Sequence, residues 1–134
     1  MAIGENKPNN VIGIPTTIDK LFRYWVEFLK PLHHLTDREM DVIIMFLKKR
    51  YELSKSIIDQ ATLNRFLMSE EIKAEIRDAC GVSPAHFQVI MGKLRKNKVI
   101  IDGNIFPKFI PNIKETDDAF QLLLYFPIIN ESQK

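Results

Sequence analysis

The sequence has very little cysteine, no long apolar run and no strong excess of one charge. Cys80 is the only cysteine among 134 residues, which excludes an internal disulfide framework and a zinc site built on several thiolates. Gln121 and Pro127 interrupt the richest apolar run, over 119–129, so no segment is long enough to span a membrane. Residues 1–15 lack the basic start and the apolar stretch of a signal peptide, and they are expected to form a flexible arm. These absences predict a cytoplasmic protein of ordinary globular composition.

The charges are unevenly distributed, although the formal net charge is only +2. Residues 83–114 hold six basic side chains and the single acid Asp102, a net charge of +5, whereas the rest of the chain holds 13 basic and 16 acidic side chains, a net charge of −3. A basic segment of this kind suits a surface that faces a polyanion. It is equally typical of a solvated helix end, because cationic side chains are favoured at helix carboxyl termini. Charge alone leaves both interpretations open.

Apolar residues at helical spacing predict two helices in the first part of the chain. The first is expected over 16–30, with Trp25 as an anchor in the core. The second is expected over 35–51, where Thr36 and Glu39 form a capping box at its start. Its last turn is expected to carry three basic side chains, those of Lys48, Lys49 and Arg50.

Three further helices are expected in the middle of the chain. A short one is predicted over 59–66, and the next begins after the capping residue Ser69 and ends at Gly81. Its inner face is predicted to consist of Ile72, Ile76, Ala79 and Cys80. The last helix is expected over 84–97, after the capping residue Ser83. Its buried stripe is predicted to consist of Phe87, Ile90, Met91 and Leu94.

The carboxyl-terminal third predicts strands, because the apolar pattern changes to a period of two residues. Runs over 99–101 and 105–110 flank Asp102-Gly103, which is a favoured hairpin turn. A third strand is expected over 119–129, followed by a frayed end over 130–134. The predicted fold class is therefore mainly α with a small antiparallel β-sheet.

This order of elements resembles the winged helix-turn-helix family. The resemblance rests on the segment from Ile76 to Ser83, on the apolar positions that follow it and on the basic helix end KLRKNKVI. It covers roughly 36–128, within one domain expected over 16–129 that adds the helix over 16–30. Arg77 departs from the family pattern, which usually has a small residue there so that the two helices can approach.

The resemblance implies a transcription or replication regulator that grips duplex DNA with the helix over 84–97 and a basic wing. It implies that Gln88 suits contact with adenine, and that Val89 and Ala85 suit contact with a thymine methyl. With about four phosphate contacts, the logarithm of the affinity should fall with the logarithm of salt concentration at a slope near −3.6. The implied nucleic-acid-binding residues are Ser83, Ala85, His86, Gln88, Val89, Lys93, Lys96, Lys98 and Lys108.

A second hypothesis predicts the same fold but a protein partner in place of DNA. Winged helices also serve as protein-interaction modules, and a fold does not determine a function. The Ile- and Lys-rich composition is similar to that of small proteins of tailed phages, which suggests a structural component of a particle. This hypothesis places a protein partner at the strand over 119–129. The DNA-binding regulator of the first hypothesis is instead expected to be a homodimer through the helix over 16–30.

Other chemistry has little support in the sequence. The adjacent pair His33-His34 has no cysteine or carboxylate at ligand spacing, so no metal site is expected. No glycine-rich phosphate loop and no Ser/His/Asp signature is present, and the chain is therefore expected to be neither an enzyme nor a cofactor carrier.

Overall fold

The computed structural model describes residues 11–130, in which five α-helices surround a small core and one two-stranded antiparallel sheet closes an edge. The helices are α1 (Ile18–Leu29), α2 (Asp37–Ser54), α3 (Gln60–Leu67), α4 (Glu70–Cys80) and α5 (Pro84–Lys96). The strands are β1 (Ile100–Ile101) and β2 (Asn104–Ile105), and the 3₁₀-helix η1 (Pro107–Phe109) follows them. The predicted class, mainly helical with a small antiparallel sheet, is confirmed.

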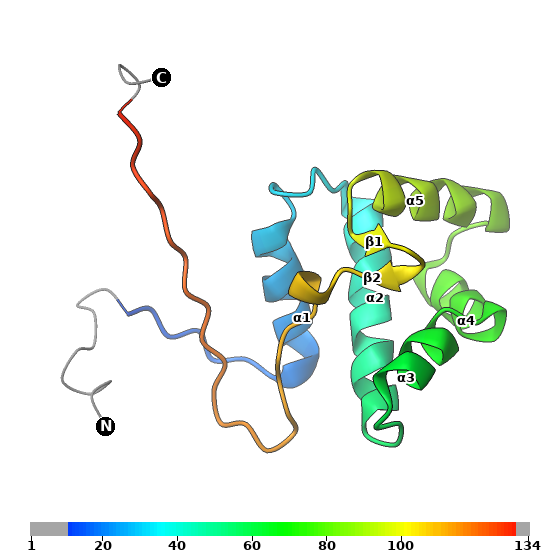
Figure 1. Ribbon diagram of the computed structural model, residues 1–134, viewed down its shortest axis with the longest axis horizontal. Helices are drawn as coiled ribbons and strands as arrows, with labels where there is room; N and C mark the ends of the chain where they lie inside the picture. The colour runs from blue at the N-terminus through cyan, green and yellow to red at the C-terminus, as the bar shows by residue number, and fades with distance from the viewer. Residues whose placement is uncertain (1–10, 131–134) are drawn as a thin grey trace.

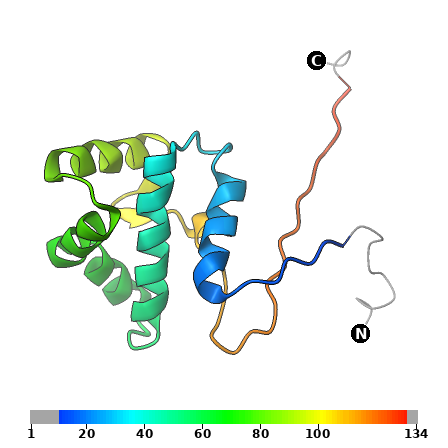
Figure 2. The same cartoon turned by 180° about the vertical axis from the view of Figure 1, so that it is seen from behind.

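Helix α2 is the central element of the fold (Figure 1). α1 lies along one side of it, α3 and α4 lie along the other, and α5 crosses one end (Figures 1 and 2). The sequence explains this position, because apolar side chains face α2's neighbours on more than one side. Its fully or almost fully buried residues are Met40, Val42, Ile43, Ile44, Phe46 and Leu47. A helix that is apolar over most of its circumference must be covered on most sides.

A side-chain cap begins each of the five α-helices of residues 11–130, and the predicted caps at Thr36, Ser69 and Ser83 are confirmed. The hydroxyl of Thr36 accepts from the backbone N–H of Glu39, and the carboxylate of Glu39 accepts from the N–H of Thr36. Asp59 and Ser69 cap α3 and α4 in the same way, each accepting from an N–H three residues ahead. Local sequence therefore determines where the helices start.

Helix α2 runs to Ser54, three residues beyond its predicted end. The predicted last-turn position of the basic residues at 48–50 is therefore wrong. Lys48 instead reaches Asp19 at the start of α1, 3.1 Å away, and Lys49 reaches Glu75 of α4, 3.0 Å away. These cations join α2 to its neighbours on both sides.

Three residues connect α4 to α5. Gly81 takes the left-handed conformation (φ 65°), and the N–H of Val82 donates to the carbonyl of Arg77, which closes α4 with a Schellman motif. The predicted helix end, the Ser83 cap and the buried stripe of α5 are all confirmed. On α4 the inner face is narrower than predicted, because Ala79 is exposed and Cys80 is only half-buried.

The hairpin after α5 is shorter than predicted. Asp102 and Gly103 both have positive φ (53° and 78°), as a type I′ turn requires, and Ile100 pairs with Ile105. The predicted strand over 105–110 is wrong beyond Ile105, because the chain enters η1 at Pro107. Proline has no N–H to offer a partner strand, and Phe109 is driven into the core.

The predicted strand over 119–129 is also not formed. The backbone there is extended, but no backbone hydrogen bond joins it to the rest of residues 11–130. The hairpin offers it no edge, because β2 ends at Ile105 and η1 occupies the following space. Figures 1 and 2 show this segment leaving the helical body beyond α1.

Two expected flexible ends fall only in part within the described residues. Residues 11–17 have no regular structure and are exposed, while the rest of the predicted amino-terminal arm and residues 131–134 lie outside the described residues. Among the helices of residues 11–130, none combines the length and the apolar character needed to cross a membrane.

Candidate nucleic-acid interface

The interface that the sequence predicts is built on α5, which the core holds along one face. Phe87, Ile90 and Leu94 are 0–3% exposed. At its carboxyl end, the carbonyl of Asn97 lies 3.1 Å from Nδ1 of His33 in the loop between α1 and α2. Burying one face in this way leaves the opposite face of α5 free along its whole length.

The end of α4 that precedes the connection is held by α2. Arg38 donates to the carbonyl of Cys80 (3.3 Å), and the Cys80 thiol lies 3.8 Å from the carbonyl of Asp41. Asp41 also pairs with Arg23 of α1 (3.3 Å). Burial, together with the nearby Asp41 carboxylate, raises the pKa of the Cys80 thiol, so this cysteine is a packing residue and not a reactive thiolate.

The exposed face of α5 is smooth along its centre and polar at its borders. Ala85, Val89 and Gly92 lie four and three residues apart, so they follow one line along the helix, and Val89 is 56% exposed. The borders carry longer polar or charged side chains, with Gln88 and Arg95 on one side and His86 and Lys93 on the other. Lys96 continues the central line at the last turn. The small residues of the central line let the helix approach a partner closely, and the longer side chains at the borders can contact the partner on either side.

The cations of this region have no ionic partner, unlike most cations elsewhere. Carboxylates lie within 4.0 Å of eight basic side chains from α1 to α4, for example Lys30 with Asp37 and Lys73 with Glu70. Within residues 11–130 no carboxylate lies that close to any base of the α5 end or of η1, namely Lys93, Arg95, Lys96, Lys98 and Lys108. This unpaired positive charge is available to an external anion.

Lys98 has an unusual backbone conformation for a lysine. Its φ is 64°, and the N–H of Val99 donates to the carbonyl of Leu94, so α5 ends in the same Schellman motif as α4. α4 uses glycine at this position, whereas α5 carries a lysine. His34 and Asp102 also have positive φ, but histidine and aspartate accept it more readily than lysine does. A cation thus stands where glycine would be more stable, beside the other unpaired cations.

Gly92 is a second residue that helix stability does not explain. It lies within α5, where glycine costs roughly 0.5–1 kcal/mol relative to alanine. A Cβ built at Gly92 would meet only the end of the flexible Arg95 side chain, 3.9 Å away, so no internal contact requires a glycine there. The free space lies on the exposed face, where a partner's backbone can approach.

The structure brings together most of the predicted site residues and separates one of them. All nine are exposed, and Ser83, Ala85, His86, Gln88, Val89, Lys93, Lys96 and Lys98 belong to α5 and its two ends. Lys108 belongs to η1, in which the backbone carbonyl of Phe109 accepts from Nε1 of Trp25 (2.7 Å). The predicted basic wing is therefore wrong, since the hairpin itself carries Asp102 at its turn and no cation.

The amino terminus of α5 offers less to a phosphate than the sequence suggests. The hydroxyl oxygen of Ser83 already accepts from the N–H of His86 (3.1 Å), and the backbone carbonyl of Ser83 accepts from the N–H of Phe87. Pro84 has no N–H, which leaves the amide of Ala85 as the free donor of the first turn. Phosphate contacts must therefore come chiefly from the carboxyl-terminal half of the helix.

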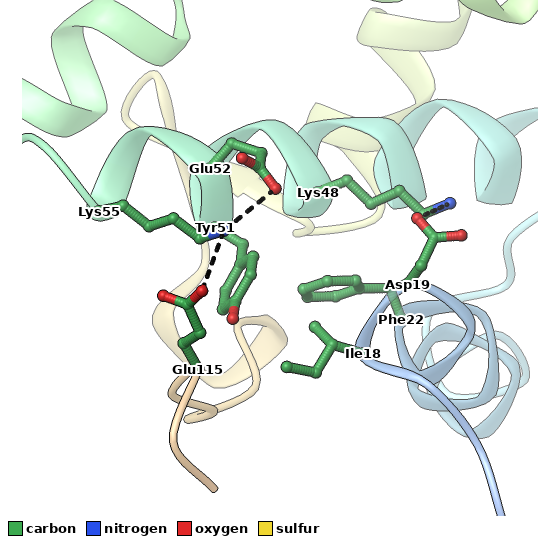
Figure 3. A pocket seen from close by; sticks show the side chains of 8 residues that line it. All are labelled: Ile18, Asp19, Phe22, Lys48, Tyr51, Glu52, Lys55 and Glu115. Atoms are coloured by element: carbon green, nitrogen blue, oxygen red, sulfur yellow. Dashed lines mark ion pairs between the residues drawn. The ribbon is translucent and has the colours of Figure 1, made fainter.

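A shallow hollow of about 250 Å³ lies elsewhere, between α1, α2 and the loop around Glu115 (Figure 3). Its charged residues pair with one another: Lys48 with Asp19, and Lys55 with both Glu52 (3.6 Å) and Glu115 (4.0 Å). Lys55 also lies over the ring of Tyr51. The ion pair between Lys55 and Glu115 thus links the end of α2 to the chain after η1.

Residues that hold the interface in place were not identified from the sequence. The sequence suggests for His33 only an unsuitable metal pair with His34, yet His33 contacts both Asn97 and the ring of Phe109, whose centroid is 5.0 Å away. Arg38 and Asp41 fasten α4 through backbone carbonyls, a contact that no local pattern signals. Within residues 11–130 no three His, Cys, Asp or Glu side chains gather as metal ligands.

In comparisons with models of protein families, with curated protein sequences and with solved structures, nothing matches this chain.

Proposed function

We propose that this protein binds duplex DNA through the exposed face of α5, as a helix-turn-helix regulator of transcription or replication. The observation that carries the proposal is the group of unpaired cations around a smooth helix face. Lysine and arginine without ionic partners are what phosphate contacts require, because binding to DNA releases the counterions of the phosphates that they neutralise. The proposal places the protein in the cytoplasm, a reducing compartment that suits a chain with a single cysteine.

The order α4, short connection, α5 and hairpin supports the proposal. In helix-turn-helix proteins the second helix lies in the major groove. Here the central line of α5 would face the bases, and the two borders would face the two phosphate backbones. Arg95 and Lys93 lie on opposite borders, so each would reach a different strand. With a hairpin this short and acidic at its turn, the grip rests on α5 and Lys98 and not on a wing.

The same face predicts weak discrimination between sequences. Gln88 is the one side chain on it that can make a paired contact with adenine, while Val89 and Ala85 offer only apolar contact to a thymine methyl. Arg95 lies in the last turn, where it suits a phosphate better than a base. We therefore expect binding to backbone to dominate over base recognition.

The test is a titration of mixed-sequence duplex DNA at several salt concentrations, followed by gel shift or fluorescence anisotropy. Four cations, Lys93, Arg95, Lys96 and Lys98, give an expected slope of roughly −3.6 per protomer for the logarithm of affinity against the logarithm of salt concentration. A slope near zero, or no binding at low salt, would overturn the proposal, because the cations would then serve only solubility.

Gly92→Ala is expected to separate stability from binding. The substitution should raise the free energy of unfolding by about 0.5–1 kcal/mol, because alanine favours the helix and the added methyl group meets no backbone. It should weaken DNA binding several-fold, because the methyl group lies on the face that approaches the duplex. Urea denaturation and the anisotropy titration measure the two effects.

The matched control for Gly92→Ala is Asn64→Ala in α3. It also improves helix propensity, but it lies outside α5 and should leave DNA affinity unchanged. If Gly92→Ala stabilises the protein and binds DNA as tightly as the original chain, Gly92 is not part of the contact surface.

A second candidate function is that of an interaction module or a structural component of a particle. The observation that favours it is the exposed apolar segment over 119–129, which the helical body leaves uncovered. A DNA-independent complex that survives nuclease treatment and substitution of Lys93 and Lys96 would support this candidate over the first.

A further inference from the structure

Residues 119–129, called here the apolar tail, form the largest apolar surface that the described chain leaves exposed. Seven large apolar residues of the tail are 38–97% exposed: Leu122, Leu123, Leu124, Tyr125, Phe126, Ile128 and Ile129. At these exposures they present on the order of 800–900 Å² of side-chain surface, given about 150–250 Å² for each large aromatic residue and somewhat less for leucine and isoleucine. Monomeric proteins seldom show a patch above about 600 Å².

The apolar tail has the conformation of a strand that has not been paired. Exposure alternates over its first part, with Leu122 and Leu124 at 38% and 50% but Leu123 and Tyr125 at 89% and 81%, whereas Phe126 and Ile128 beyond that part are 76% and 97% exposed. This period of two is that of an extended strand with one face turned toward the body. The even-numbered face begins with Phe120, whose ring meets that of Trp25 of α1 edge-on at 5.5 Å.

The two edges of the apolar tail differ in their capacity to pair. In a strand, alternate residues direct their N–H and C=O groups toward opposite edges. Pro127 lacks an N–H and lies on the edge of the odd-numbered residues. The other edge offers an uninterrupted row from Phe120 to Ile128, and no other described residue pairs with it.

We propose that the apolar tails of two copies of this chain pair as antiparallel strands through this edge, and so make the protein a homodimer. A two-fold axis at Leu123 gives a self-complementary register, in which Phe120 faces Phe126 of the partner subunit. In the same register Leu122 faces Leu124 of the partner subunit. The even-numbered residues from Phe120 to Phe126 then pair with those of the partner subunit, Ile128 extends beyond the paired stretch, and Pro127 stays on the outer edge.

A second copy suits the apolar tail better than an unrelated partner does. The segment has no charged side chain, so it offers no charge pattern for a different protein to match. Its own symmetry supplies like residues opposite like residues, as a two-fold interface requires.

The register also brings each tail to an exposed part of the partner. The far end of one tail, with Phe126, comes to the start of the other tail, where Phe120 rests on α1 of that subunit. There α1 exposes Tyr24 and Phe28, at 41% and 45%. In the proposed dimer, α1 therefore contributes to the interface beside the paired tails. The sequence-based expectation of a dimer through the helix over 16–30 is included in this proposal.

Cysteine cross-linking without DNA tests the register, in a Cys80→Ser background. Leu123→Cys places two thiols at the axis, where paired Cα atoms of a non-hydrogen-bonded position lie about 4.5 Å apart. Tyr125→Cys is the matched control, because residue 125 faces residue 121 of the partner and not itself. Mild oxidation should convert Leu123→Cys, but not Tyr125→Cys, to a species of twice the 15.6 kDa chain mass.

Proline substitutions test the paired edge by light scattering on the full chain. Leu122→Pro removes an N–H from the paired edge of both subunits and should weaken dimerisation about 10- to 100-fold. Tyr125→Pro removes an N–H from the outer edge and should weaken it far less. A monomer at high concentration, equal cross-linking at 123 and 125, or a tail folded back on its own α1 would overturn the proposal. Because no step involves DNA, its failure is distinct from failure of the proposed function.

Discussion

Lys93→Glu combined with Lys96→Glu is expected to weaken binding to duplex DNA about 50- to 100-fold at roughly 0.1 M salt. Each phosphate contact contributes a counterion-release term worth nearly a factor of ten at that salt concentration, and two such contacts are lost. Repulsion between the new carboxylates and the phosphates adds to the loss. The salt slope should fall by about half, to roughly −1.8 per protomer. An anisotropy titration over several salt concentrations measures both quantities.

The matched control for this double substitution is Lys20→Glu with Arg65→Glu. Both residues are exposed, lie outside α5, and have no carboxylate within 4.0 Å among residues 11–130. Either double substitution changes the formal net charge from +2 to −2. The control should lose little affinity if the position of the charge matters. Equal losses in the two variants would show that total charge, and not the α5 surface, governs binding.

Phe109→Ala is expected to destabilise the protein by about 3–5 kcal/mol, a large part of the 5–15 kcal/mol of a typical domain. Phe109 is 1% exposed, although it follows the hairpin in a short 3₁₀-helix. Its ring meets that of His33, and its carbonyl accepts from Nε1 of Trp25 at 2.7 Å. The substitution leaves a cavity beside α1 and loosens η1, which packs on the core between α1 and the hairpin. Urea denaturation followed by circular dichroism measures the loss.

Leu32→Ala is the control for Phe109→Ala. Leu32 is 73% exposed in the loop after α1, so removing its side chain should change the free energy of unfolding by less than about 0.5 kcal/mol. A loss below about 1 kcal/mol for Phe109→Ala would contradict the packing described for η1. Loss of the His33 contact should also free the end of α5, so DNA affinity is expected to fall alongside stability.

The sequence alone determined the helices and most of the α5 surface. Cap residues such as Thr36 and Ser83 act within one turn, so the information needed to place a helix start lies within four residues. The spacing of Phe87, Ile90 and Leu94 in the same way decided which side of α5 is buried, and hence that Gln88 and Lys93 are exposed. The turn at Asp102-Gly103 is equally local, because it depends on two residues that accept positive φ.

Only the tertiary structure decided what the chain does after Ile105. Runs of alternating apolar residues predict strands, but a strand needs a neighbour, and neighbours are a property of the whole fold. The ring of Phe109 is buried beside Trp25 and His33, and β2 does not extend to this residue. Burial of a phenyl ring stabilises the fold by more free energy than two further backbone hydrogen bonds of a strand would. That choice removes Lys108 from the hairpin and leaves residues 119–129 without an edge to join. The tail is thus extended, apolar and unpaired because the strand edge of the hairpin ends at Ile105 and η1 packs where a further strand would have to lie.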